Sequence, residues 1–309
     1  MSGCVTMYRT SMIAPWVVYL PDNSVLDTTG THTSGLQEML FWARDYGFNA
    51  RLDAGGICPP SLGGINYAQI VCNRTLHILT TNVGLIDFGA CSLILKPENP
   101  SDDGITIDSA DMGKITGSGF IVYTGTGSAV HEFPRYDNGE NFIGSCNNEI
   151  YLGDIVIGHP DTYLPRNDVG VGWRFSPQNG DMIHLRRRFN VNGGVVGVQV
   201  DNPTGAHQFN NNNLDIMCHG QGYASLMVGT SNTEQIWGND WRFKASVAAG
   251  DTRGLVTHAV GDAYTGSIQG ALIGVQEGGS AKDNRYVIPT NRSTTPFHDG
   301  STAHTSKWL

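Results

Sequence analysis

The sequence is poor in charge and has no long hydrophobic run. Charged residues make up 15% of the 309 residues, and 28 acidic against 19 basic side chains give a formal net charge of −9. This balance argues against a nucleic-acid binder, whose binding face is normally basic, and an anionic membrane surface would repel it. No segment approaches the ~20 apolar residues of a membrane span. We therefore expect neither nucleic acid nor membrane insertion.

The sequence also lacks a cysteine pattern and a signal peptide. The six cysteines show no CxxC or Cys/His spacing, so zinc is not expected, and no motif indicates another metal or a cofactor. We expect scattered buried thiols in a reducing compartment. The apolar stretch Ser11–Leu20 is short and broken by Pro15, so it does not predict a secretory leader. Synthesis in the cytoplasm, without secretion by that route, follows as the expectation.

What the sequence has in abundance is glycine and short apolar runs closed by turn residues. Glycine accounts for 40 residues, and typical runs are Gly172–Phe175, Val196–Val200 and Leu226–Val228. Each is followed by a cluster of Asn, Gly, Pro, Ser, Thr or Asp, which are strand and turn signals. The closing turns recur about every 25 to 30 residues, a period typical of solenoids and propellers. The pattern predicts an all-β fold of stacked coils.

One segment, Ser34–Tyr46, has the signals of a helix. Ser34 and Gln37 have the spacing of a capping box, and Gly47 is placed to end the helix in a left-handed conformation. Four apolar residues follow the spacing of a half-buried helix: Leu36, Met39, Leu40 and Ala43. An amphipathic helix here would cover the first coil, whose sheet edges would otherwise be exposed.

The segment Thr33–Leu40, followed by a strand, resembles the entry to pectate-lyase-like right-handed β-helices and, more closely, to phage tailspike-type proteins. Leu85–Gly89 and Gly104–Asp108 resemble the next coils of that group, and Asn232–Asn239 resembles its asparagine-rich turns. The resemblance covers roughly Asn23 to Gly278. It implies a right-handed parallel β-helix over residues 33–278 with a capping helix at 34–46. Residues 1–32 would then form an anchoring or packing arm and residues 279–309 an extended tail.

Aspartates begin several of the apolar runs, and two of them suggest chemistry. Asp215 and Asp240 lie about one coil apart in the aligned sequence, and equivalent positions in stacked coils are about 4.8 Å apart. Carboxyl groups roughly 5 Å apart are typical of retaining glycosidases, so these two are the catalytic candidates if the protein is an enzyme. The alternative is a ladder in which Asp caps turns and Arg balances the charge.

The same coils carry side chains suited to saccharides. Trp173, Tyr223, Trp237 and Trp241 could stack on sugar rings, and Arg187 could bind an acidic saccharide through its planar fork. Internal aromatic stacking is the alternative for the aromatic set. For Arg186–Arg188, the alternative is a surface or subunit contact with Asp, and side-chain alternation would point the middle arginine away from its neighbours.

The resemblance implies a phage virion protein, tailspike-like, used for capsid decoration or host adsorption. Such β-helices commonly form homotrimers, so the expected partners are two further copies, other virion proteins of the capsid or tail, and bacterial surface polysaccharide. The alternative function is a polysaccharide depolymerase, either a glycoside hydrolase or a lyase. No calcium-binding cluster of aspartates in adjacent coils is evident, which counts against lyase chemistry.

Overall fold

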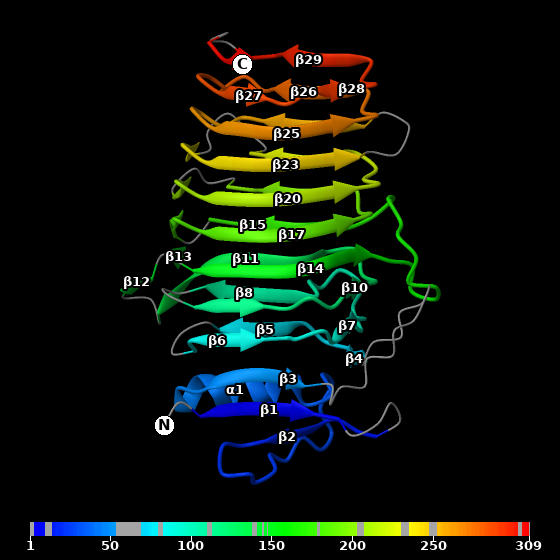
Figure 1. The fold of residues 1–309 in the computed structure, drawn as a ribbon, viewed down its shortest axis with the longest axis vertical. Coiled ribbons are helices and arrows are strands. Elements are labelled where there is room, and N and C mark those ends of the chain that lie inside the picture. Colours follow the sequence, from blue (N-terminus) through cyan, green and yellow to red (C-terminus); the bar gives the residue numbers. More distant parts are fainter. Residues whose placement is uncertain are drawn as a thin grey trace.

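The protein is a stack of parallel β-coils. A computed structural model describes residues 3–9, 14–53, 69–79, 83–109, 113–137, 141–143, 145–146, 148–177, 180–202, 207–229, 235–246, 252–301 and 305–308. The coils rise along the long axis, with the N-terminus at one end and the C-terminus at the other (Figure 1). No helix in this part of the chain is long and apolar enough to cross a membrane.

The strands fall into three sheets, which we call sheets A, B and C. The 16 strands of sheet A are β1 (Cys4–Tyr8), β2 (Val17–Tyr19), β3 (Asn49–Asp53), β4 (Gln69–Cys72), β6 (Leu85–Asp87), β7 (Ser92–Leu95), β9 (Lys114–Thr116), β10 (Ile121–Tyr123), β14 (Glu149–Ile157), β17 (Arg186–Asn192), β20 (Asn213–His219), β23 (Asp240–Ser246), β25 (Ala263–Gln269), β27 (Arg285–Val287), β28 (Thr290–Asn291) and β30 (Lys307–Trp308).

Sheets B and C are smaller. The ten strands of sheet B are β5 (Leu76–Leu79), β8 (Ile105–Ser109), β11 (Ser128–Asp137), β12 (Asn141–Ile143), β15 (Val171–Phe175), β18 (Val196–Val200), β21 (Ala224–Val228), β24 (Arg253–Thr257), β26 (Ile273–Glu277) and β29 (Thr295–Asp299). The four strands of sheet C are β13 (Ser145–Cys146), β16 (Met182–Ile183), β19 (Gln208–Asn210) and β22 (Gln235–Trp237).

The chain visits the sheets in a repeating order. From β16 to β23 it passes through C, A and B in turn, and each strand pairs in parallel with the strand one coil later. This confirms the predicted all-β fold, and the parallel sheets are compatible with a β-helix or solenoid. Strands also occur in the segments expected to be an arm and a tail, since β1 pairs with β3 and β29 with β26.

The helix α1 (Leu36–Tyr46) lies near the N-terminal end of the stack, packed against β1, β3 and β5 (Figure 1). Its predicted apolar stripe is buried, and Gly47 is left-handed at its end. The predicted capping box is wrong. The Ser34 hydroxyl donates to the Val71 carbonyl instead, and the Gln37 amide makes two hydrogen bonds with the backbone of His77. Both side chains thus tie the helix to strands rather than cap it.

Inward side chains stack from coil to coil and form one core. In β20, Leu214, Ile216 and Cys218 are buried, while the residues between them face outward. Aromatic rings continue the stack along the axis, for example Trp241 against Tyr264 at 6.1 Å and Tyr264 against Tyr286 at 5.3 Å between ring centroids. Each coil therefore buries its apolar side chains only against the coils on either side.

A ladder of polar side chains lies inside the turn that leads into sheet A. Each side-chain oxygen in it accepts the backbone N–H of the equivalent residue one coil earlier. The pairs are Leu185 to Asn212 (2.9 Å), Asn212 to Asn239 (3.1 Å), Asn239 to Asp262 (2.9 Å) and Asp262 to Asn284 (2.9 Å). These N–H groups are buried in turns, where no sheet partner satisfies them, so the ladder removes a cost of about 1–3 kcal/mol per group.

Breaking one rung of the ladder should destabilise the stack. Asn239 accepts from Asn212 and donates to the Phe209 carbonyl, so Asn239→Ala leaves two buried backbone groups unpaired. We expect a loss of about 2–4 kcal/mol in the free energy of unfolding, measured in urea. The matched control is Asn213→Ala, at an exposed position of β20, which should change stability by less than about 0.5 kcal/mol. Equal effects of the two substitutions would contradict the ladder.

Asp262 occupies a rung of the ladder and should make stability depend on pH. Burial raises the pKa of Asp262 from 3.8 to about 6, against hydrogen bonds from Asn239, Trp241 and Tyr264. The folded state thus holds this proton more tightly than the unfolded state does. The resulting stability is complete below about pH 4 and is lost as the pH rises through 6, a loss of about 3 kcal/mol.

Asp262→Asn removes this titration. The effects of all other titrating groups on stability are common to both proteins, so they cancel when the variant is compared with the unmodified protein. Urea unfolding of both proteins between pH 4 and pH 8 should show the unmodified protein losing stability relative to Asp262→Asn. A difference between the two proteins that does not change with pH would show that Asp262 does not titrate in this range.

Candidate functional site

The outer face of sheet A is polar and carries two rows of charged side chains. In the first row Glu149 pairs with Arg186, which pairs with Asn213, which pairs with Asp240 on successive strands. Two residues further along the strands, the second row contains Arg188, Asp215 and Arg242 in register. Side chains of opposite charge thus alternate along the axis, and amides and carboxylates lie between the guanidinium groups.

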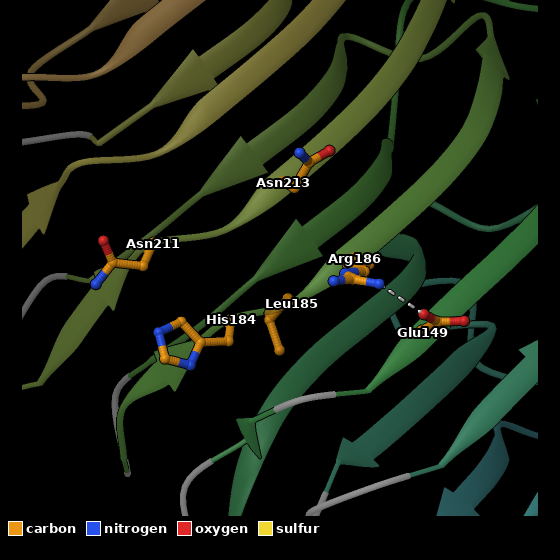
Figure 2. A pocket seen from close by; sticks show the side chains of 6 residues that line it. All are labelled: Glu149, His184, Leu185, Arg186, Asn211 and Asn213. Carbon is orange, nitrogen blue, oxygen red and sulfur yellow. Dashed lines mark hydrogen bonds and ion pairs between the residues drawn. The ribbon is translucent and has the colours of Figure 1, made fainter.

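A hollow of about 450 Å³ opens beside the first row. It is lined by Glu149, His184, Leu185, Arg186, Asn211 and Asn213, shown in Figure 2. Arg186 Nη1 lies 3.1 Å from Glu149 Oε1, and Lys114 Nζ lies 3.6 Å from the other carboxylate oxygen. The hollow therefore offers an imidazole, two amides and an ion pair within a volume typical of small-ligand sites.

His184 and Asn211 reach this hollow because of the backbone conformation of the turns. Both residues are left-handed, with φ of 56° and 53°. In each turn the next residue, Leu185 or Asn212, points inward to the core and the ladder. A left-handed residue followed by an inward residue leaves the first side chain on the surface, at the start of a sheet A strand. The stacked turns thus hold a line of polar side chains beside sheet A.

A second hollow, of about 420 Å³, lies further along the same face and includes Gly238, Asp240 and Arg285 in its lining. Trp237 stands at the corner before it, 41% exposed, directly preceding Gly238. Trp237 is also in register with Asn210, the residue before Asn211 of the first hollow. An exposed indole is therefore placed near a polar hollow and a second hollow lined by both apolar and polar residues, an arrangement suited to stacking on a sugar ring with hydrogen bonds beside it.

Three of the predicted saccharide-binding side chains are not on the surface. Trp173 and Trp241 are fully buried in the aromatic stack, where Trp173 lies 4.2 Å from Phe189 between ring centroids. Arg187 is 1% exposed. Because these three side chains are buried, they cannot contact a saccharide, and that prediction is wrong for them. Each lies at an inward position of its strand, as the alternation of side chains dictates.

Arg187 instead belongs to a buried ion-pair network inside the stack. Its guanidinium donates to both carboxylate oxygens of Glu132 and to the side-chain and backbone oxygens of Asn148. Arg187 and Glu132 side chains have no exposed surface. Its neighbours Arg186 and Arg188 point outward to Glu149 and Asp215. The three consecutive arginines thus serve two different faces of the sheet.

Asp215 and Asp240 lie on adjacent strands and both face outward, but not opposite each other. Asp240 is in register with Asn213, and Asp215 is in register with Arg242. The offset of two residues makes them diagonal neighbours on parallel strands, roughly 8 Å apart between Cα atoms rather than about 5 Å. Asp215 also lies 3.8 Å from Arg188 Nε. The structure therefore separates the two carboxylates further than the aligned sequence predicts.

Tyr223 is exposed but far from the other candidates. It begins the run into β21, at the opposite end of β20 from Asn213, and the Arg253 guanidinium lies 4.7 Å from its ring centroid. The structure thus leaves Trp237 as the one predicted aromatic residue beside the hollows.

The sequence reasoning missed His184 and Asn211, although a signal was present. The turns before β17, β20 and β23 repeat the same pair of positions, a left-handed residue followed by a buried one. The pairs are His184–Leu185, Asn211–Asn212 and Gly238–Asn239. In the described part of the chain, no group of three or more His, Cys, Asp or Glu side chains is arranged to hold a metal ion. No protein-family model, curated protein or solved structure matches the chain.

The buried network gives a prediction that separates the adjacent arginines. Arg187→Met removes the cation that pairs with the buried Glu132 carboxylate and should cost about 3–5 kcal/mol in the free energy of unfolding. Arg186→Met, one residue away, removes an exposed ion pair and should cost less than about 1 kcal/mol. Urea unfolding measures both. If the two substitutions had similar effects, Arg187 would not hold a buried carboxylate.

Proposed function

We propose that this chain is a phage virion protein for host adsorption or capsid decoration, which binds surface saccharide along the outer face of sheet A. The observation that carries the proposal is Trp237, an exposed indole near two hollows whose linings include amide and charged side chains. Saccharides combine apolar ring faces with many hydroxyl groups, so a flat aromatic ring flanked by amides and charged groups suits their chemistry.

The arrangement of the sheets and the helix also supports the proposal. We interpret the stack as a right-handed parallel β-helix of the tailspike type, with α1 covering its first coils. Of the segment Asn232–Asn239, which resembles the asparagine-rich turns of that group, residues 232–234 lie outside the described residues, and Asn239 is a rung of the ladder. A rigid stack suits adhesion, because neighbouring turns present side chains at fixed spacing and little flexibility is lost on binding.

A homotrimer attached to other virion proteins completes the proposal. The polypeptide has a mass of 33.3 kDa, so a trimer would have a mass of about 100 kDa in solution. Light scattering of the purified protein measures this directly. A monomeric mass at micromolar concentration would contradict the trimer while leaving saccharide binding open.

Saccharide binding is tested with immobilised capsular polysaccharides and lipopolysaccharides from bacterial hosts. We expect Trp237→Ala to weaken binding at least about tenfold, because stacking over a sugar ring is lost, a change equivalent to 1.4 kcal/mol. The matched control is Trp308→Ala, equally exposed at 41% but in the terminal strand β30. Binding that is unaffected by Trp237→Ala, or absent for every polysaccharide, would overturn the proposed site.

The alternative function, a glycan depolymerase, is tested in the same preparations. Asp215 and Asp240 remain its candidate catalytic residues, and their shared outer face beside the second hollow is the observation in its favour. New reducing ends or unsaturated products, abolished by Asp215→Asn or Asp240→Asn, would make the protein an enzyme rather than an adhesin.

A further inference from the structure

A chain of three side chains crosses the outer face of sheet B, on strands that the proposed saccharide site does not use. Asp103 precedes β8, His131 lies within β11, and Ser176 follows β15 directly. These strands are neighbours in the order β8, β11, β15. His131 Nδ1 lies 2.6 Å from Asp103 Oδ2, and His131 Nε2 lies 2.8 Å from Ser176 Oγ.

His131 takes this position because its neighbours in the strand point inward. Val130 and Glu132 are buried, and Glu132 is the partner of Arg187 in the core. His131 and Glu132 therefore face opposite sides of sheet B. The imidazole instead spans the two strands on either side of β11 and connects a carboxylate with a hydroxyl.

Contact with an ionised Asp103 favours, in the neutral imidazole, the tautomer with its proton on Nδ1. Asp103 Oδ1 accepts the Ser128 backbone N–H at 2.8 Å, which holds the carboxylate in place. Burial opposes ionisation of Asp103, but the hydrogen bonds and charge of His131, with those of Ser128, outweigh it and lower its pKa. An ionised Asp103 accepts Nδ1–H, which leaves the Nε2 lone pair directed at the Ser176 hydroxyl.

Arg174 adds a cation beside this chain. It is in register with His131 on the adjacent strand and lies two residues before Ser176, on the same face. One guanidinium nitrogen, Nη2, bonds to Asp201, while Nε is buried and has no hydrogen-bond partner among the described residues. A positive charge near a nucleophile is suited to stabilise an oxyanion that develops there.

We propose that Ser176, His131 and Asp103 form a second site, which hydrolyses carboxylic esters such as the O-acyl groups of surface saccharides. Ser176 Oγ attacks the acyl carbon while its proton passes to His131 Nε2. The ester C–O bond then breaks, and the leaving alkoxide takes that proton, which leaves the acyl group on Ser176. Water attacks the acyl carbon and gives a proton to His131, and Ser176 Oγ departs and recovers the proton as the free acid forms.

In this scheme Ser176 and His131 are the catalytic residues and Asp103 is a positioning residue. The ester approaches across the outer face of sheet B, over His131 and Arg174, whose side chains are 19% and 33% exposed. Ser176 itself is 2% exposed, and its hydroxyl lies against the imidazole, so the ester must reach it beside His131. The site is independent of the saccharide hollows, because those lie on sheet A.

The test uses diisopropyl fluorophosphate on the full chain. Attack by Ser176 Oγ on phosphorus releases fluoride, its proton passes to His131, and one phosphoryl adduct remains. Intact-mass measurement and peptide mapping should locate a single adduct on Ser176. Ser118, whose hydroxyl donates to the Gly89 carbonyl and touches no histidine, is the internal control and should stay unlabelled. No adduct on Ser176, or equal labelling of Ser118, would overturn the proposal.

Variants separate activation by His131 from simple exposure of a serine. His131→Gln should slow labelling of Ser176 at least about 100-fold, the usual contribution of a general base. His219→Gln, at an exposed position of β20, is the control and should leave labelling unchanged. Asp103→Asn should also slow labelling, and Asp103→Glu should restore part of it. Hydrolysis of p-nitrophenyl acetate should change in parallel. Labelling that is equally fast in the His131→Gln protein would exclude the mechanism.

If His131→Gln does not fold, the unmodified protein still decides the question, because labelling of Ser176 over Ser118 requires no variant. Failure of this test leaves saccharide binding by the hollows of sheet A untouched, and failure of saccharide binding leaves the ester site untouched. The two proposals therefore have separate outcomes.

Discussion

The structure depends on the parallel pairing of each coil with the next. Backbone hydrogen bonds join β17, β20 and β23 in register, and inward side chains therefore pack on those of the neighbouring coils. The turns between sheets would leave buried N–H groups unpaired, and the polar ladder satisfies them. The constraint that forms the core thus also fixes the turns, whose outer residues line the candidate site.

Side chains alternate between the core and the surface along each strand, and this alternation decides which residues are available for the proposed functions. In the run of three arginines the middle one satisfies a buried carboxylate, while the outer two join a charged surface. Similarly, Glu132 belongs to the core, and its neighbour His131 belongs to a polar chain on the outside of sheet B. One strand can therefore carry a structural and a chemical role in adjacent residues.

Much of the secondary structure could be predicted from the sequence, because it depends on local patterns. The apolar run Val196–Val200 is the strand β18 with the same bounds, and the helix appears with its apolar stripe and its left-handed glycine. The offset of Asp215 and Asp240 could not be predicted, because aligning the sequences of two neighbouring coils does not show which residues lie opposite each other. The burial of Trp173 and Trp241 was also ambiguous, since aromatic residues suit a core and a sugar-binding surface equally.

The most direct measurement is a crystal structure of the protein with the oligosaccharide that it binds most tightly. We predict a sugar ring stacked on Trp237, with hydroxyl groups bonded to side chains of the adjoining hollows at His184, Asn211 or Asp240. A saccharide bound on sheet A without contact to Trp237, or no saccharide on sheet A at all, would contradict this prediction.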